Sequence, residues 1–433
     1  MLMKSNTKFK FIDLFAGLGG FHVALKSLGG ECVFASEINN ELRGAYLANH
    51  GIYPDGDITM VDPYKIPDHD ILTAGFPCQP FSKAGSQKGF SYKGQGNLFF
   101  DIERILKVKK PNYILLENVP NIVSHDGGNT IKTIFKSLEN IGYEVKLELF
   151  SPHQFGVPQQ RYRAYIVGKL NGMSNFEWPN IDSNQDTDIR QILEKNPNSA
   201  KKISEKLEEI LKNWNSFVDK LGQSEISGGY PLWGMEWGAD YPYEKKTPFQ
   251  YLTSSSPSGL RKYKGSFGIP LANVRNWQDR WQLLPHYARE EVLNFPDWKK
   301  KFIRQNREFF EMNKNKTKNL IKELKNYYPS FQKLEWNIKE KTDGIFSQII
   351  QTRASGIRVK TTKYAPSIVA ISSQQIPIVG WEKRYMTATE CQRLQNLESL
   401  KWLPDKLEDK FKALGNAVNS KVVGRVAFSL LNS

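Results

Sequence analysis

The stretch that decides the fold of this chain is Phe9–Gly20, which reads FKFIDLFAGLGG. Phe9–Phe15 has the pattern of a buried strand, and apolar residues at helical spacing follow the glycines as far as Gly29. A strand, a glycine-rich turn and a helix open the nucleotide-binding α/β folds. The glycines let the backbone approach a ligand closely, and the helix N-terminus favours a negative group. A tight turn without a ligand is the plainer interpretation of the glycines alone.

Two acidic residues after this unit support a ligand that contains adenosine. A second strand, Cys32–Ser36, ends at Glu37, and an acid about 20 positions after the glycine turn is the usual partner of ribose hydroxyls. Glu37 could instead cap a helix that begins near Asn39. Asp57 ends an acidic turn and could accept a hydrogen bond from an adenine amine, although Asp-Gly-Asp is also an ordinary turn composition.

A cysteine follows the next strand. The apolar run Asp70–Gly75 leads into residues 75–82, which read GFPCQPFS. Pro77 and Pro80 bracket Cys78 and predict a stiff loop, because each proline fixes its own φ and lacks an N–H. A thiol at the end of such a strand lies where open α/β sheets bind ligands, so Cys78 is a candidate nucleophile. A lone cysteine is more often an inert buried residue.

An acid and two arginines follow on later strands. Asn112–Leu116 predicts a buried strand that ends in Glu117, so we expect Glu117 to converge with Cys78 at the carboxyl edge of a parallel sheet. Arg161 and Arg163, just before the run Ala164–Gly168, are predicted to alternate on a strand, so that they share one face and suit a phosphate or carboxylate. A solvated basic edge is the alternative.

Composition limits the partners. The chain has 433 residues, a net charge of +15 and 12% aromatic residues, which suits a globular protein with a polyanionic partner such as nucleic acid. Three cysteines without paired spacing predict neither a disulfide framework nor a zinc site, and they favour a reducing compartment. The sequence predicts no membrane span, no signal peptide and no metal site.

The α/β alternation stops after Lys169. We therefore predict three parts: residues 1–170, an irregular domain at 171–380, and a segment at 381–433 that returns to the first domain. Residues 83–96 look like a mobile loop that closes over a polyanion, or a plain linker. The lysine-rich stretch 297–328 predicts a solvated helix face. Ile349–Lys363 predicts a loop or β-ribbon whose long basic side chains reach bases and phosphates.

The ordered motifs resemble those of the DNA cytosine-5 methyltransferase family, in its bacterial restriction–modification type. The resemblance rests on Phe15–Gly20, Pro77-Cys78-Gln79, Glu117-Asn118-Val119, Gln159-x-Arg161-x-Arg163, Arg384–Leu397 and Gly415–Val418. It covers residues 9–169 and 384–431. It implies a Rossmann-like sheet with helices on both faces, a smaller and irregular target-recognition domain, and S-adenosylmethionine as methyl donor.

The resemblance also implies a role for each motif residue. In the implied mechanism the Cys78 thiolate attacks carbon 6 of cytosine, and a protonated Glu117 lies near ring nitrogen 3. Arg163 holds the ring carbonyl, and Arg161 supports Cys78 or a phosphate. Asn118 orders the loop that carries Cys78. The implied cofactor contacts are Phe15, Gly17, Gly19, Gly20, Glu37, Ile38, Asp57, Ile58, Pro77, Asn416 and Val418. The predicted DNA contacts are Ser82, Ser86, Gln87, Arg353, Arg358 and Lys360.

The predicted reaction is methylation of a flipped-out cytosine in double-stranded DNA, because Cys78 cannot reach carbon 6 inside a duplex. We expect a monomer in the bacterial cytoplasm, associated with the nucleoid and paired with a cognate restriction endonuclease. Two alternatives remain open from the sequence. One is a tRNA cytosine-5 methyltransferase, which the long variable segment disfavours. The other is a catalytically silent DNA-binding module, which has no need of Cys78, Glu117 and both arginines together.

Overall fold

The structure is a computed structural model, and it describes residues 8–77, 98–181, 186–226, 229–253, 257–368 and 375–433. The chain divides into two compact units. The first comprises residues 1–197, 363–373 and 387–433, and the second comprises 198–362 and 374–386. The first unit therefore extends past residue 170, where the sequence placed its end, and the C-terminal return begins at 387.

Six described strands form the sheet of the first unit, in the order β2-β1-β3-β4-β7-β5. Strands β2, β1, β3 and β4 are parallel, while β7 is antiparallel to both β4 and β5. The parallel strands carry their carboxyl ends to one edge, where the motifs cluster. The strands are β1 (Phe9–Leu14), β2 (Gly30–Ser36), β3 (Ile71–Gly75), β4 (Tyr113–Asn118), β5 (Tyr143–Phe150) and β7 (Arg163–Leu170).

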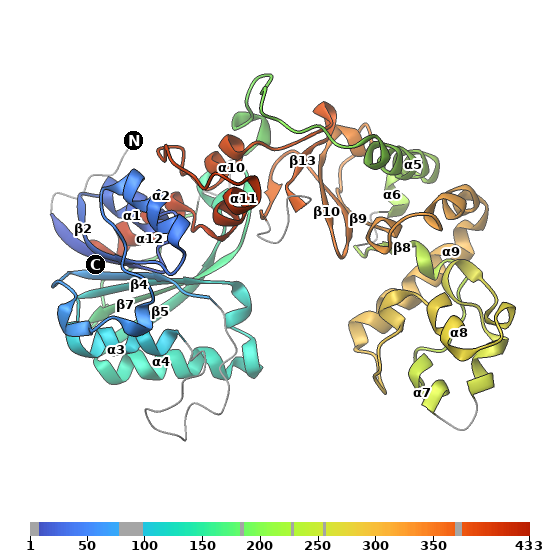
Figure 1. The fold of residues 1–433 in the computed structure, drawn as a ribbon, viewed down its shortest axis with the longest axis horizontal. Coiled ribbons are helices and arrows are strands. Elements are labelled where there is room, and N and C mark those ends of the chain that lie inside the picture. The colour runs from blue at the N-terminus through green and yellow to red at the C-terminus, as the bar shows by residue number, and fades with distance from the viewer. Residues whose placement is uncertain (1–7, 78–97, 182–185, 227–228, 254–256, 369–374) are drawn as a thin grey trace. The chain divides into compact units, whose positions relative to one another are not determined.

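Both faces of this sheet are covered by helices, because its strands carry consecutive apolar residues that point to opposite faces. Phe11 and Leu115 face a core that includes residues of α1 (Gly20–Ser27) and α12 (Ser420–Leu431). Ile12 and Leu116 face the opposite core, with α3 (Phe99–Lys109) and α4 (Asn129–Ile141). The C-terminal helix α12 lies beside α1 from the start of the chain (Figure 1). The predicted α/β class with helices on both faces is confirmed.

The returning segment supplies short helices to the first unit. Helix α10 (Ala388–Leu394) is preceded by its N-cap Thr387, which forms a capping box with Glu390. Helix α11 (Leu407–Asn416) follows, and its last residue precedes the turn into α12.

The second unit is more regular than its composition suggests. Its six described strands lie in the order β14-β13-β10-β11-β9-β8. One face of the sheet packs against α5 (Glu205–Leu221) and the long helix α9 (Asp297–Leu324). The strands are β8 (Leu232–Trp233), β9 (Lys333–Asn337), β10 (Ile349–Arg353), β11 (Gly356–Lys360), β13 (Ile378–Val379) and β14 (Arg384–Tyr385).

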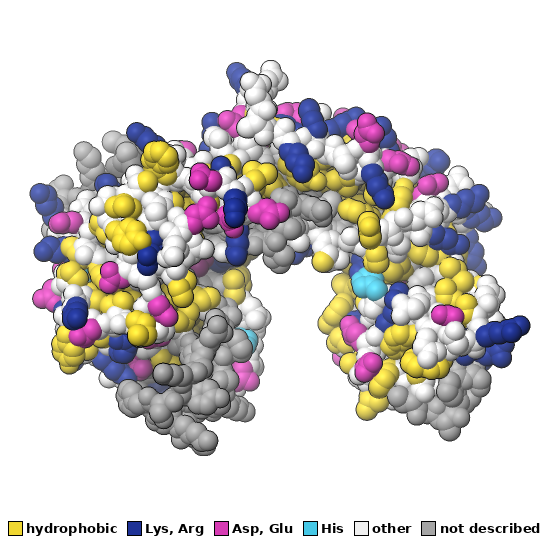
Figure 2. Space-filling view, viewed as in Figure 1, with side chains coloured by type: hydrophobic (Ala, Val, Ile, Leu, Met, Phe, Trp, Pro, Cys, Tyr) yellow, Lys and Arg dark blue, Asp and Glu magenta, His cyan; other side chains and the backbone are white. Residues whose placement is uncertain are grey.

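The lysine-rich helix α9 has a buried and a solvated face. Ile303, Phe309, Leu320 and Leu324 are buried, whereas lysines such as Lys314 and Lys318 are exposed. Figure 2 shows Lys and Arg side chains over the region of α5 and α9 on the face in view. The helix therefore combines a core stripe with the solvated face that the sequence predicts.

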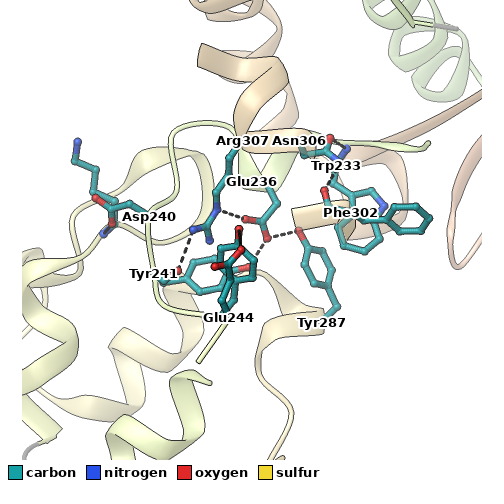
Figure 3. A network of polar contacts seen from close by, with 11 residues as sticks. Trp233, Glu236, Asp240, Tyr241, Glu244, Tyr287, Phe302, Asn306 and Arg307 are labelled. Carbon is teal, nitrogen blue, oxygen red and sulfur yellow. Dashed lines mark hydrogen bonds and ion pairs between the residues drawn. The ribbon is translucent and has the colours of Figure 1, made fainter. Parts of the chain in front are cut away.

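A buried charge network joins α9 to the segment that follows β8 (Figure 3). Glu236 is fully buried and accepts hydrogen bonds from the Tyr241 and Tyr287 hydroxyls and from Arg307 Nε, the last at 3.0 Å. Arg307 Nη1 also donates to the Tyr241 carbonyl at 3.0 Å. Because several donors share the carboxylate, its burial is compensated only while they all remain in place.

Replacement of Arg307 tests this network. Arg307→Met leaves Glu236 buried without its cation, so the free energy of unfolding of the second unit should fall by about 3–5 kcal/mol in urea titrations. Arg304→Met is the matched control, because the Arg304–Glu244 pair joins half-exposed side chains at 2.8 Å, where solvent screens the charges, so its loss should change the stability far less. Equal losses in the two variants would show that Glu236 does not depend on Arg307.

Candidate active site

The glycine turn after β1 has a left-handed backbone at three residues. Phe15, Gly17 and Gly19 have φ values of 55°, 54° and 82°. A non-glycine residue rarely adopts such a φ, and it persists only where its surroundings fix it. The Ala16 N–H donates to the Ser36 carbonyl at 2.9 Å, and the Gly17 N–H donates to Glu37 Oε2 at 2.9 Å. The turn is thus tied to the end of β2.

Glycine is required at positions 19 and 20 because other groups approach their Cα atoms. A Cβ on Gly19 would lie 2.3 Å from His50 Nε2, and a Cβ on Gly20 would lie 2.5 Å from Val418 Cγ2. Val418 is buried against the start of α1. The structure thus brings together two predicted cofactor motifs, the turn and the C-terminal return, that are about 400 residues apart in the sequence.

The two predicted acids lie on neighbouring segments. The Glu37 N–H donates to the Asp55 carbonyl at 2.8 Å, which places the turn that ends at Asp57 beside the end of β2. Glu37 Oε1 accepts from the Asn39 N–H at 2.9 Å, and Asp57 Oδ1 accepts from the Thr59 N–H at 2.9 Å. The cap of α2 (Asn40–His50) is the Asn39 side chain. Glu37 is therefore not the cap residue, and each acid keeps further lone pairs for a ligand.

The remaining predicted cofactor residues differ in exposure. Ile38 is 71% exposed, and Pro77 and Asn416 are also exposed. Ile38 directly follows Glu37, so an exposed apolar side chain and a carboxylate adjoin each other at this point. Ile58 is different, since its side chain is buried in the core under α3 and leaves only its backbone for a ligand.

A side-chain amide links the acid strand to the segment that leads to Cys78. In the parallel pairing of β3 with β4, Gly75 lies opposite Glu117. Asn118 Nδ2 donates to the Phe76 carbonyl at 2.9 Å, and the Val119 N–H donates to Asn118 Oδ1 at 2.8 Å. The amide is satisfied on both sides and holds the backbone two residues before Cys78. Cys78 itself lies outside the described residues.

Glu117 lies in a buried and positively charged environment. Arg163 Nε is 3.1 Å from Glu117 Oε1, although their angles do not make a hydrogen bond. Burial raises the pKa of Glu117, and the charges of Arg163 and Arg161 only partly oppose that rise. A carboxyl in this position holds a proton at a higher pH than an ordinary glutamate does, so it is suited to donate a hydrogen bond.

Arg161 and Arg163 do not share a strand, contrary to the prediction. Strand β7 begins at Arg163, and Arg161 lies in the connection after β6 (Gln159–Gln160). The two guanidiniums still act on the same carboxyl. Arg161 is buried, and its Nη2 donates to the Ala417 carbonyl at 3.2 Å. Burial lowers the pKa of Arg161 to about 10, with Arg163 adding to the effect, so Arg161 remains charged at neutral pH.

Ser151 is a site residue that the sequence did not reveal. Its hydroxyl is fully buried and accepts from the Arg161 N–H at 2.8 Å, so it fixes the backbone that carries Arg161. Ser151 also begins a capping box with Gln154. That local pattern, Ser-x-x-Gln, is visible in the sequence, but the contact with Arg161 is not.

The predicted DNA contacts fall into two groups. Ser82, Ser86 and Gln87 lie outside the described residues. Arg353, Arg358 and Lys360 lie on the hairpin of β10 and β11, where the pairing of Gln351 with Arg358 places all three cations on one face. Arg358 is already paired with Glu335 at 2.8 Å. Burial lowers the pKa of Lys360 to about 8, and the charge of Arg358 adds to that effect.

Comparison with known proteins decides the family. Residues 9–257 match the family model described as C-5 cytosine-specific DNA methylase. The chain is 44% identical over 291 residues to type II methyltransferase M.NlaX of Neisseria lactamica, an alignment that covers 62% of this chain and 90% of that protein.

This chain belongs to the C-5 cytosine-specific DNA methylase family. A second relative, type II methyltransferase M.MspI of a Moraxella species, is 46% identical over 189 residues, and the alignment spans 44% of this chain and 45% of that protein. A solved structure of a putative DNA modification methyltransferase encoded within an Escherichia coli prophage has a TM-score of 0.52 at 17% identity. That match covers 98% of this chain and 99% of the other, and it shows a shared fold.

C-5 methylases take their methyl group from S-adenosylmethionine. Membership of the family therefore confirms the predicted family, enzyme class and cofactor. The residues present fit such a group, because the turn, the Glu37 carboxylate and the exposed Ile38 adjoin one another at the edge of the sheet. Among the described residues, no helix is both long and apolar enough to cross a membrane. The same residues contain no cluster of three or more candidate metal ligands.

The raised pKa of Glu117 predicts a pH-dependent stability. A folded-state pKa above the usual value of about 4.3 means that the native state binds this proton more tightly than the unfolded chain does. The stability that this proton contributes is complete below the usual pKa of about 4.3, and it is lost as the pH rises through the higher pKa of the folded state.

Urea titrations of the cofactor-free protein from about pH 4 to pH 8 check this sign. Wild type should lose stability relative to Glu117→Gln as the pH rises, whereas the exposed control Glu31→Gln should follow wild type throughout. Parallel curves for wild type and Glu117→Gln would mean that the carboxyl has the same pKa in the folded and unfolded states.

Proposed function

We propose that this chain methylates carbon 5 of a cytosine flipped out of duplex DNA, with Cys78 as the covalent nucleophile. The observation that carries the proposal is the Glu117 site. A buried carboxyl with a raised pKa lies at the same sheet edge as the segment leading to Cys78, and Asn118 ties the two together at 2.9 Å. A DNA-binding module without activity has no use for this arrangement.

The proposed chemistry begins with the Cys78 thiolate. Carbon 5 of cytosine is a poor nucleophile, and formation of a bond between sulfur and carbon 6 turns it into an enamine-like one. Glu117, in its protonated form, donates a hydrogen bond at ring nitrogen 3 and stabilises the negative charge that develops in the ring. Once carbon 5 carries the methyl group, loss of the carbon-5 proton to solvent restores the double bond between carbons 5 and 6, and the sulfur–carbon bond breaks with its electron pair returning to the Cys78 thiolate.

The arginines divide the remaining work in this proposal. Arg163, at 3.1 Å from Glu117, holds the carbonyl of the cytosine ring. Arg161 is buried and fixed to the Ala417 carbonyl, so its charge supports the Cys78 thiolate or a phosphate from a constant position. Electrostatic support from fixed groups is effective because the protein need not reorganise during the reaction.

S-adenosylmethionine, when bound, supplies the electrophilic methyl group. In this proposal Glu37 holds the ribose, Ile38 and Phe15 face the adenine, and Asp57 accepts from the adenine amine. The backbone of the turn Gly17–Gly20 receives the methionine part, with Pro77, Ile58, Asn416 and Val418 completing the pocket. The support is the shared sheet edge and the open side chain of Ile38.

We place the DNA contacts on the two groups of residues predicted for them. The cationic face of the β10–β11 hairpin offers Arg353, Arg358 and Lys360 to DNA, and Ser82, Ser86 and Gln87 act beside the flipped nucleotide. The relatives are named type II methyltransferases, which supports a role in a restriction–modification system with a cognate endonuclease. In that role the protein acts as a monomer on DNA in the bacterial cytoplasm, at the nucleoid.

Transfer of tritium from labelled S-adenosylmethionine tests the proposal. Wild type should label mixed-sequence duplex DNA and leave tRNA unlabelled. Cys78→Ser should abolish labelling, and Glu117→Gln should lower it by about 100-fold or more, in the range of general acid catalysis. Glu31→Gln, on an exposed strand position, is the matched control and should behave as wild type.

Two results would contradict the proposal in different ways. Labelling of tRNA alone would make the chain a tRNA cytosine-5 methyltransferase. Labelling of neither substrate by a wild type that binds DNA would support a silent DNA-binding module.

A further inference from the structure

The segment between β8 and β9 forms a lobe with its own core in the second unit. Trp233, Leu260, Leu271, Leu284 and Phe295 are buried in this core, which is distinct from the core under the sheet. The lobe includes α7 (Pro248–Thr253), α8 (Trp277–Leu283) and the start of α9 (Figure 1). None of these elements belongs to the sites described so far.

The buried network of Figure 3 holds two surface segments of this lobe together. Arg307 fixes the Tyr241 carbonyl at 3.0 Å, next to Asp240. The Asp240 N–H donates to the Lys264 carbonyl at 3.2 Å, and the Lys264 N–H donates to Asp240 Oδ1 at 2.5 Å. These bonds fix the backbone of Asp240, Tyr241 and Lys264, and they thereby anchor the start of residues 240–246 and the end of residues 261–264 to the lobe.

These two segments carry a surplus of positive charge. The stretch 244–264 contains five cations and one carboxylate. The cations, all exposed, are Lys245, Lys246, Arg261, Lys262 and Lys264. Among the described residues none of the five has an ion-pair partner, and the one carboxylate, Glu244, is held by Arg304 at 2.8 Å. Like charges held on one rigid surface repel one another, and an anionic partner relieves that repulsion.

Two tyrosines lie among these cations. The Tyr251 and Tyr263 rings meet edge to face with centroids 6.0 Å apart, and Lys262 Nζ lies 5.2 Å from the Tyr263 centroid. A hydrogen bond with Tyr263 raises the pKa of Tyr251, and the charges of Lys262 and Lys246 oppose that rise. Both lysines thus lie near the same ring, although they come from opposite ends of the stretch.

We propose that this surface, formed by Lys246, Tyr251, Arg261, Lys262 and Tyr263 and termed the Tyr251 surface, binds the sugar–phosphate backbone of duplex DNA outside the recognised sequence. The inference rests on the proposed function and extends it to flanking DNA. Unpaired cations neutralise phosphates and release condensed counterions, and half-exposed tyrosines add contact area and hydroxyl donors. Contacts of this kind lengthen the DNA footprint without reading its sequence.

The salt dependence of DNA binding tests this surface. The triple variant Lys246→Gln, Arg261→Gln and Lys262→Gln is compared with wild type by fluorescence anisotropy on mixed-sequence duplexes of about 40 base pairs. Each phosphate contact contributes about 0.9 to the slope of log K against log salt concentration. The variant should therefore lower the magnitude of the slope by about 2 to 3, with an unchanged melting temperature because all three side chains are exposed.

The matched control is Lys132→Gln with Lys136→Gln, two exposed lysines on α4 of the first unit, which should leave the slope unchanged. A wild-type slope in the triple variant would overturn the inference. The inference would also be overturned if the triple variant bound duplex DNA with the wild-type slope and lost slope only on single-stranded RNA. That result would assign the surface to another nucleic acid. Tritium transfer by wild type separates the two proposals, since a reduced slope without methylation would refute the proposed function and leave the Tyr251 surface standing.

Discussion

One hydrogen bond connects the strand that carries Glu117 to the segment that precedes Cys78, that from Asn118 Nδ2 to the Phe76 carbonyl. Parallel pairing of β3 and β4 brings their carboxyl ends to one edge, but it does not fix the chain beyond the last paired residues, Gly75 and Glu117. The Asn118 amide also fixes Phe76, the residue that follows Gly75 at the end of β3. Its own oxygen is held by the Val119 N–H, so the amide orientation is determined.

The same edge gathers opposite charges in a buried setting. Glu117 is stabilised by two arginines and destabilised, in its ionised form, by burial, and burial has the larger effect on its pKa. Arg161 is in turn held by Ser151 and by the Ala417 carbonyl of the returning segment. The C-terminal part of the chain therefore contributes to the position of a group near the acid, as well as to the packing of Val418 against Gly20.

Sequence patterns predicted those parts of the site that depend on local structure. The glycine turn, the alternation of strands and helices, and the position of Glu117 at a strand end all follow from short-range periodicity and chain chemistry. The patterns failed where contacts between residues far apart in the sequence determine a strand boundary, the direction of a side chain or a hydrogen-bond partner. Strand β7 starts only at Arg163, Ile58 points into the core, and Ser151 reaches Arg161 across a turn. The second unit has a regular sheet because its short strands are paired by distant segments, such as β8 with β9, about 100 residues apart.

Formation of the covalent adduct with duplexes containing 5-fluorocytosine tests the role of Asn118 most directly. Asn118→Asp keeps the acceptor for the Val119 N–H and replaces the donor to Phe76 with a repelling oxygen. A nucleophile displaced by about 1 Å loses up to about 100-fold in rate. We predict at least a tenfold slower adduct formation with unchanged affinity for S-adenosylmethionine. Adduct formation at the wild-type rate would contradict the account, because the segment leading to Cys78 would then not depend on the acid strand.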